Sequence, residues 1–318
     1  MNIVPRIYRD ASDLQKMCAL LQTGCADQTT NAYYAHPGDL NWWLFNWLDG
    51  QNPWQHIYLW DAPANPERLL GWGLFTPWSA FDVFVQPELC DSAWAAEVNT
   101  WMEEKSAERA RRQGHTYLQR MNVAETDKHL REHLCGRGFQ HVPENMLAMR
   151  CSLERELPQP ILPEGYALRP VEETNAVSRA AAQHAAFQSG TSWQDYLQIY
   201  SHFMASLGYP TGCDWAVIAP DGCVAAFCIA WPDAVSRIGQ IEPVGTHPDF
   251  QRKGLGKAVM SAGMCHLQSL GMRSVRICVL ADNPAAFKLY ESVGFHTVNK
   301  LLLHQKAGSV PVTSRWHS

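Results

Sequence analysis

The stretch 238–300 decides the fold of this chain, and it reads IGQIEPVGTHPDFQRKGLGKAVMSAGMCHLQSLGMRSVRICVLADNPAAFKLYESVGFHTVNK. A strand-like run over 239–246 ends before Pro248, and a glycine-rich turn then leads into an apolar-periodic helix over 255–270. The first amide groups of a helix have no partner inside the helix and carry partial positive charge. We therefore expect this turn to bind an anion.

The side chains of the turn fit the same interpretation. Gly254 and Gly256 have no side chain that would hold a phosphate away from the backbone. Formal positive charge is added by Arg252, Lys253 and Lys257. A turn of this kind at a helix start is typical of a pyrophosphate site.

Two common pyrophosphate motifs are excluded by the residues present. A Walker A loop needs a glycine at position 251 and a Ser or Thr at 258, where the chain has Gln251 and Ala258. A dinucleotide fingerprint needs a third glycine at position 259, where Val259 stands. The pattern Gln-x-x-Gly-x-Gly over 251–256, followed by NPAAFKLYESVGF over 283–295, instead resembles the acyl-CoA-binding core of the GNAT superfamily of N-acetyltransferases.

This resemblance implies where acetyl-CoA binds. The strand before the loop diverges from the strand after it, and its last backbone groups pair with the pantetheine arm. A glycine at 245 fits a close approach of that arm, although a bulge glycine explains the same residue. The implied cofactor-binding positions are Val244, Gly245, Thr246, Gln251, Arg252, Lys253, Gly254, Leu255, Gly256, Lys257, Asn283 and Ala286.

Two residues are candidates for the acid–base chemistry of acyl transfer. Tyr290 follows Asn283 by close to two helical turns, so both point to one side of the helix, and the resemblance makes Tyr290 the acid that protonates the leaving thiolate. Tyr290 as a core aromatic is the alternative. Glu242 is the only acid in the strand before the loop, and alternation places it on one face with Gln240 and Val244. It is the candidate base, with an exposed strand residue or a substrate anchor as the alternatives.

Composition excludes several classes of protein. The chain has 318 residues and a net charge of −5, so a basic nucleic-acid-binding face is not expected. The N-terminal residues lack a signal-peptide apolar region and no apolar run is long enough to span a membrane, so no membrane partner is expected. Ten cysteines without a CxxC pair indicate a reduced, cytoplasmic compartment. No cluster has metal-ligand spacing, so no metal is expected.

The chain repeats one order of elements twice. We expect an α/β (α+β) fold of two tandem acetyltransferase-like domains, each a mixed, mainly antiparallel sheet flanked by helices, with a diverging strand pair at the cofactor site. Residues 1–156 form the first domain, the Pro-rich segment 157–165 a linker, and 166–318 the acetyl-CoA-binding catalytic domain. The first domain is degenerate, because 88–95 holds no glycine, and Asp127 and Leu134 replace Asn283 and Tyr290.

The acceptor is less well defined than the cofactor. We expect transfer of acetyl to a primary amine of a small molecule by direct attack in a ternary complex, and a homodimer is possible. The alternatives are a non-catalytic CoA-responsive binding protein and an enzyme acting on a protein or peptide amine. The tandem arrangement also resembles enzymes that acetylate the cysteinyl amine of a glycosidic thiol precursor. An open groove beside Glu242 predicts a peptide, and a cleft closed by the first half, with the aromatic cluster 42–47 as its cover, predicts a small molecule.

Overall fold

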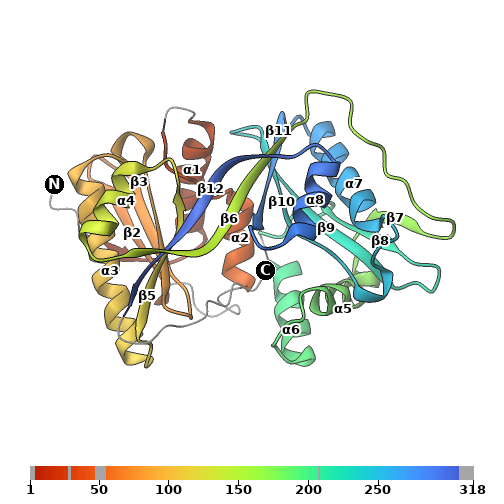
Figure 1. Cartoon of the computed structure of the whole chain (residues 1–318), viewed down its shortest axis with the longest axis horizontal. Helices are drawn as coiled ribbons and strands as arrows, with labels where there is room; N and C mark the ends of the chain where they lie inside the picture. Colours follow the sequence, from red (N-terminus) through yellow and green to blue (C-terminus); the bar gives the residue numbers. More distant parts are fainter. Residues whose placement is uncertain (1–3, 28–29, 47–54, 207, 308–318) are drawn as a thin grey trace.

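The computed structural model describes residues 4–27, 30–46, 55–206 and 208–307. Twelve strands of these residues form one continuous sheet, in the order β1-β2-β3-β4-β5-β12-β6-β11-β10-β9-β8-β7. Helices cover the sheet in two groups, one for each half of the chain (Figure 1). Neighbouring strands are antiparallel except for the pairs β4–β5 and β10–β11. The expected mixed, mainly antiparallel architecture is confirmed.

The described residues of the first half form strands β1 to β6 and helices α1 to α4. In chain order its elements are β1 (Arg6–Ile7), α1 (Ala11–Ala26), α2 (Pro37–Asn46), β2 (Ile57–Ala62), β3 (Asn65–Phe75), β4 (Ala80–Val85), the 3-10 turn η2 (Pro87–Leu89), α3 (Ala93–Arg112), β5 (Tyr117–Ala124), α4 (Lys128–Gly136) and β6 (Gln140–Ser152).

The second half repeats this order, as its sequence predicts. Its elements are β7 (Ala167–Pro170), η3 (Glu173–Asn175), α5 (Ala176–Ala186), α6 (Trp193–Met204), β8 (Asp214–Ile218), β9 (Val224–Asp233), β10 (Ile238–Thr246), η4 (Pro248–Phe250), α7 (Leu255–Ser269), β11 (Ser274–Leu280), α8 (Pro284–Ser292) and β12 (His296–Ala307).

Local side-chain caps explain where several of these helices begin. Asp10 accepts a hydrogen bond from the Ser12 amide at the start of α1, and Ser92 accepts one from Ala95 at the start of α3. Asn283 does the same for Ala286 at the start of α8. Each cap satisfies an amide that the helix itself leaves without a partner.

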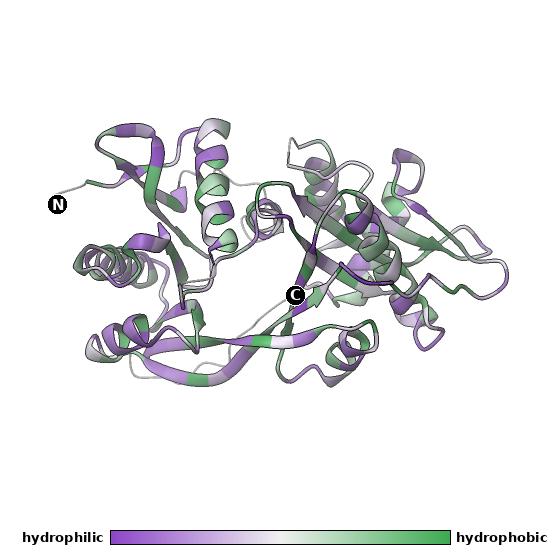
Figure 2. Ribbon diagram, turned by 90° about the horizontal axis from the view of Figure 1, so that it is seen from above, coloured by the Kyte–Doolittle hydropathy of each residue, from purple (hydrophilic) through white to green (hydrophobic). Residues whose placement is uncertain are grey.

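The last strands of the two halves are exchanged. β6, which precedes the expected linker, pairs with β11 of the second half, with Met149 opposite Ile277. β12 pairs with β5 of the first half, with Leu302 opposite Val123. β6 and β12 also pair with each other, and both run between the halves when the molecule is seen from above (Figure 2). The hydrogen-bonded ladder of the sheet therefore continues from one half to the other without interruption.

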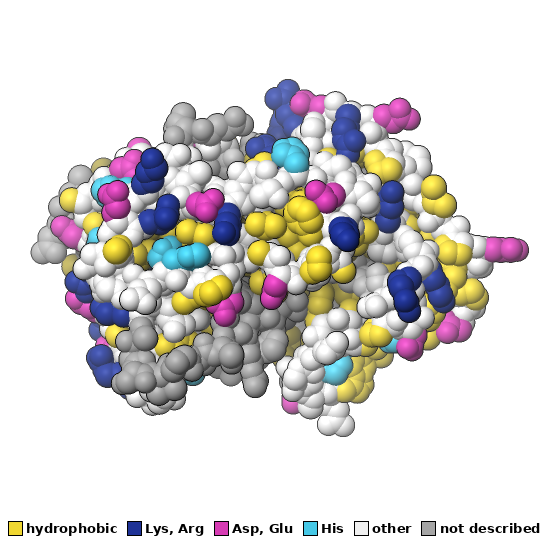
Figure 3. All heavy atoms as spheres, viewed as in Figure 1, with side chains coloured by type: hydrophobic (Ala, Val, Ile, Leu, Met, Phe, Trp, Pro, Cys, Tyr) yellow, Lys and Arg dark blue, Asp and Glu magenta, His cyan; other side chains and the backbone are white. Residues whose placement is uncertain are grey.

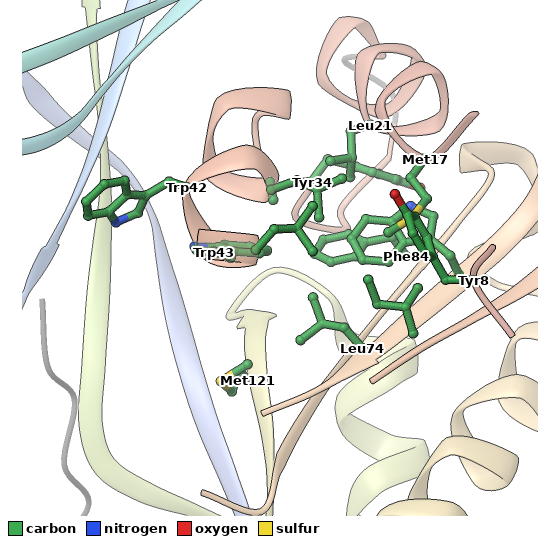
Figure 4. Close-up of a cluster of buried hydrophobic side chains, with 14 of the residues drawn as sticks. Tyr8, Met17, Leu21, Tyr34, Trp42, Trp43, Leu74, Phe84 and Met121 are labelled. Atoms are coloured by element: carbon green, nitrogen blue, oxygen red, sulfur yellow. The ribbon is translucent and has the colours of Figure 1, made fainter. Parts of the chain in front are cut away.

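Helix α2 joins the hydrophobic cores of the two halves. One cluster of buried residues contains Met17 and Trp72 of the first half together with Phe203 and Trp231 of the second. Trp42 contacts the Phe203 ring edge-on, with ring centroids 5.3 Å apart. In Figure 4 it points away from the other labelled side chains of this core. Thus α2 belongs by sequence to the first half and packs on the second.

Candidate active site

The candidate site begins where β10 and β11 diverge. These parallel strands pair only from Ile238 to Gln240 on β10 and from Ser274 to Arg276 on β11. Beyond Gln240, β10 stays bonded to β9 on its other side, so a gap opens between β10 and β11. The diverging strand pair predicted from the sequence is therefore present.

A cavity of about 170 Å³ occupies this gap. Its walls come from β10, β11 and α8 of the second half, and from α2 of the first half. On the surface, hydrophobic side chains gather near the middle of the face shown in Figure 3, between the two halves. The lining residues are Tyr33, Asp39, Trp42, Trp43, Asn122, Met146, Phe187, Glu242, Pro243, Val244, Cys278, Val279, Leu280, Asn283, Ala286 and Tyr290.

Glu242 lies on the cavity wall, but the expected alternation around it is wrong. The register of β10 against β9 shifts between Ile241 and Val244, because Pro243 has no amide hydrogen to donate to the ladder. As a result Glu242, Pro243 and Val244 all line the cavity, whereas Gln240 is buried and is not among its lining residues. The Trp231 indole donates to the Glu242 carbonyl at 2.6 Å, which fixes the bulge.

The ionisation of the Glu242 carboxyl group is shifted into the range around neutral pH. Burial, and then the negative charge of Asp39, raise the pKa of Glu242 to about 8. The structure shows no hydrogen bond from a described residue to this carboxyl group. A carboxylate with a raised pKa and free oxygens in a cavity is typical of a general base.

Tyr290 faces the same cavity from α8. Its side chain is buried against Phe295, and burial raises the pKa of the Tyr290 phenol, as does the nearby charge of Glu242. The hydroxyl group makes no hydrogen bond with a described residue. Tyr290 is therefore protonated at neutral pH and has a proton to donate into the cavity.

The glycine-rich loop has the backbone that the sequence predicts. Gly254 has a φ of 79° and stands just before α7, a conformation that side-chain-bearing residues rarely adopt. Arg252, Lys253 and Lys257 are exposed around it. The linker residues Ile161 and Pro163 line a second hollow with Lys253, Gly254 and Lys257. The loop thus offers open amides and positive charge at one place.

The remaining expected cofactor positions surround the cavity and the loop. A Cβ on Gly256 would lie 3.1 Å from the Thr246 hydroxyl, so α7 approaches the end of β10 closely. A Cβ on Gly245 would lie 2.4 Å from the Phe227 ring, so packing of that ring alone already requires glycine there. Val244, Asn283 and Ala286 line the cavity, and Asn283 also caps α8. Gln251 is exposed before the loop, and Leu255 is buried behind it.

Several residues of this site were not predicted. Asp39 lies in the first turn of α2, and nothing in its local sequence marks it as part of a site. Trp42 and Trp43 confirm the expectation that the aromatic cluster covers the cleft, whereas Trp47 lies outside the described residues. Asp39 can be recognised as a residue of this cavity only from the packing of α2 on the second half.

The first half has a corresponding place with different contents. β4 and β5 pair only at Ala80 and Phe81 and then diverge, as β10 and β11 do. The Tyr34 hydroxyl donates to the carbonyl of Val85 at the end of β4, at 2.7 Å. Ser92 caps the start of α3, and Leu134 is buried where α8 has Tyr290. In the first half, side chains therefore engage the Val85 carbonyl at the end of β4 and the Ala95 amide at the start of α3.

Two features are absent from the residues that the structure describes. No helix there is long and apolar enough to cross a membrane. No three or more His, Cys, Asp or Glu side chains gather there in a way that would hold a metal ion.

Comparisons with known proteins agree with this geometry. Residues 179–295 match the acetyltransferase (GNAT) family model. A mycothiol acetyltransferase of Streptomyces griseus is 33% identical over 148 residues, which are 45% of this chain and 47% of that protein. Another from Saccharomonospora viridis is 30% identical over 179 residues, covering 51% and 56%. The chain thus matches about half the length of these curated relatives.

Solved structures match nearly the whole chain. A tandem GNAT protein from the clavulanic acid biosynthesis pathway has a TM-score of 0.66 at 14% identity, over 98% of this chain and 99% of that one. A GCN5-related N-acetyltransferase from Sphaerobacter thermophilus has a TM-score of 0.64 at 17% identity, over 98% and 97%. These likenesses show that both halves share one tandem acetyltransferase fold. The match to the acetyltransferase (GNAT) family model, over residues 179–295, includes the glycine-rich loop, Glu242 and Tyr290.

Proposed function

We propose that this chain is an acetyl-CoA-dependent N-acetyltransferase that transfers acetyl to a primary amine of a small molecule. The observation that carries the proposal is the placement of Glu242 and Tyr290 on one cavity. That cavity opens between the diverging strands β10 and β11. A carboxylate and a protonated phenol facing one space are the two groups that aminolysis of a thioester needs.

The cofactor side of the site is formed by the loop and by the end of β10. The amides at the start of α7, with Arg252, Lys253 and Lys257, bind the pyrophosphate. Backbone groups of Val244 to Thr246 pair with the pantetheine arm on the side that β11 leaves open. Asn283 and Ala286 line the far wall of the same channel.

The reaction follows as a direct attack in a ternary complex. Glu242 takes a proton from the acceptor ammonium, and the neutral amine nitrogen then forms a bond to the thioester carbonyl carbon. The carbon–sulfur bond breaks, and the departing thiolate takes the Tyr290 proton. The nitrogen still carries one excess proton, which passes to the Tyr290 phenolate and restores the phenol. The products are the acetylated amine and CoA, and Glu242 returns to its carboxylate form by releasing its proton to the solvent.

The closed cleft supports a small acceptor over a peptide. Asp39, Trp42 and Trp43 of α2 line the cavity together with Glu242, so the first half contributes to its wall. The relatives named mycothiol acetyltransferases match about half of this chain, so their acceptor is not carried over to it. We further propose that residues 1–156 and 166–318 act as two domains joined by the linker 157–165, with one cofactor site in the second.

The test is isothermal titration of acetyl-CoA, followed by a screen of amines by thiol release. We expect one acetyl-CoA per chain and thiol release that depends on the amine. The Glu242→Gln variant should keep acetyl-CoA affinity and lose most of the amine-dependent rate. Glu291→Gln, an exposed carboxylate next to Tyr290, is the matched control. Two acetyl-CoA per chain would contradict the single site, and thiol release unaffected by any amine would contradict the transferase.

A further inference from the structure

We infer that the acceptor is a small primary amine with an apolar, largely aromatic or aliphatic body, and that its ammonium group binds between Asp39 of the first half and Glu242 of the second. This inference rests on the proposed function and names its substrate class. It also makes Asp39 a specificity-determining residue contributed by the half of the chain that lacks a cofactor site.

The position of Asp39 is fixed relative to β10. His36 accepts a hydrogen bond from the Gly38 amide at Nδ1, so its Nε2 carries the proton and donates to the Ile238 carbonyl at 3.0 Å. Asp39 in turn accepts from the His36 amide at 2.8 Å through one carboxylate oxygen. The start of α2 is therefore bonded to β10, the strand that carries Glu242.

A second contact holds the same two elements together. A Cβ on Gly38 would lie 2.4 Å from the Trp231 ring, so α2 approaches β9 as closely as a backbone can. The same Trp231 donates to the Glu242 carbonyl. Asp39 and Glu242 are thus positioned by one shared scaffold, and their spacing does not depend on a flexible loop.

The charge of the cavity suits a cation. Asp39 is 4% exposed and has only one oxygen engaged by His36, while Glu242 has no described partner. No Lys, Arg or His is among the described residues that line the cavity. Burial raises the pKa of Asp39 to about 6, and the charge of Arg276 opposes this shift only in part. The Arg276 guanidinium stacks on Tyr33 and donates to the Tyr34 carbonyl. An ammonium group is the ligand that stabilises the ionised forms of two such buried carboxyl groups.

Apart from polar groups such as Asn122 and the Tyr33 hydroxyl, most of the wall around the carboxylates is apolar. It is formed by Trp42 and Trp43 of α2, Phe187 at the end of α5, Met146 of β6 and Pro243 of β10. Such surface favours an apolar body by burial of about 25 cal/mol per Å², and aromatic rings add attraction to a cation. A polyhydroxylated body would instead leave its hydroxyl groups facing carbon, which costs free energy for each group that loses water.

The test compares ligands that differ in one feature at a time, by calorimetric titration into the full chain saturated with CoA, which has no acetyl group to give. The probes are 2-phenylethylamine, its neutral isostere 2-phenylethanol, and the polyhydroxylated amine glucosamine. We expect the amine to bind at least tenfold more tightly than either of the other two. In the Asp39→Asn variant the amide oxygen can still accept the hydrogen bond from the His36 amide. The affinity of this variant for the amine should be at least tenfold lower than that of the parent, and its affinity for the alcohol should be less than twofold lower. Asp195→Asn, an exposed first-turn residue of α6, is the matched control.

Each outcome decides the inference. Tighter binding of glucosamine would overturn the apolar body, and equal losses of amine and alcohol in Asp39→Asn would make Asp39 structural. Because these titrations need no acetyl transfer, they are separate from the proposed function. If the amine binds as expected but acetyl-CoA with amine releases no thiol, the amine site stands and the transferase activity fails.

Discussion

At Glu242, one neighbouring proline determines which way the carboxyl group faces. Alternation predicts that a strand residue shares its face with the residues two positions away, and it failed here because Pro243 produces a bulge. The identity of Glu242 as the acid of this strand was readable from the sequence. Its cavity position and its proximity to Asp39 were not, because both depend on a helix about 200 positions earlier in the chain.

The raised pKa of Glu242 predicts the pH dependence of catalysis. The base must be ionised to accept a proton, so kcat/KM should rise with pH through an ionisation near pH 8. Glu242→Gln should remove this ionisation and lower kcat by roughly 10²- to 10⁴-fold, the usual contribution of a general base. A pH profile of both proteins checks this. A profile unchanged in shape would assign the ionisation to another group.

The same carboxyl group predicts a pH dependence of stability. Its pKa is about 8 in the folded chain and has the ordinary value of 4.5 when unfolded. Between these values the folded state holds a proton that the unfolded state has released, so stability falls as pH rises, by at most about 1.4 kcal/mol per pH unit. The stability of Glu242→Gln does not fall with pH for this reason, because the amide does not ionise. The Tm of the variant relative to that of the parent should therefore be higher at pH 8 than at pH 5. A Tm difference independent of pH would contradict the shift.

The proposed role of Tyr290 as an acid predicts that its removal lowers kcat but leaves the affinity for acetyl-CoA nearly unchanged. Removing its hydroxyl in Tyr290→Phe removes the proton for the thiolate and no hydrogen bond to a described residue. We expect kcat to fall by roughly 10²-fold or more, with the acetyl-CoA dissociation constant within about threefold. Tyr33→Phe, which removes a hydroxyl from the same cavity beside Cys278, is the matched control. Equal loss of rate and affinity in Tyr290→Phe would leave Tyr290 a structural residue.

At the scale of the element, helix α7 has a left-handed glycine at each end. Gly254 precedes its first residue with φ 79°, and Gly271 follows its last turn with φ 83°. A Cβ would meet nothing within 4 Å at either position, so Ala at each costs only backbone strain, on the order of 1 kcal/mol. Gly254→Ala should also weaken acetyl-CoA binding, because it turns the loop amides, whereas Gly271→Ala should not. Titration of acetyl-CoA into both variants, at a temperature where both are fully folded, checks this prediction. Equal affinities of the two variants would show that the pyrophosphate does not bind at this loop.

The elements themselves were largely predictable, and the reason is local. A glycine at the start of α7 and the apolar spacing along it specify a helix through neighbours in sequence. The contribution of α2 could not be predicted in the same way. Trp42 and Trp43 indicated a covered surface, but that α2 presents Asp39 beside β10 follows only from its contacts with Ile238 and Trp231.

At the scale of the whole molecule, the exchange of β6 and β12 is the feature that local sequence could not reveal. In the sequence, β6 and β12 are the last strands of their own halves. Pairing between strands distant in sequence leaves no local signal, because the same pattern fits either neighbour. The exchange places Met149, a residue before the linker, in the core of the second half with Ile277 and Val259.

This exchange predicts that the halves remain together when the linker is cut. Cleavage at a protease site introduced after the exposed Ile161 would break the covalent connection between 1–161 and 162–318. The pieces would still share the β6–β12 and β6–β11 ladders and the core that α2 joins. We expect the cut protein to elute at the size of the intact chain, to keep its acetyl-CoA affinity and to unfold in one transition. Two half-sized species in native buffer would show that the halves are independent domains connected only by the linker, because intact ladders do not dissociate without denaturant.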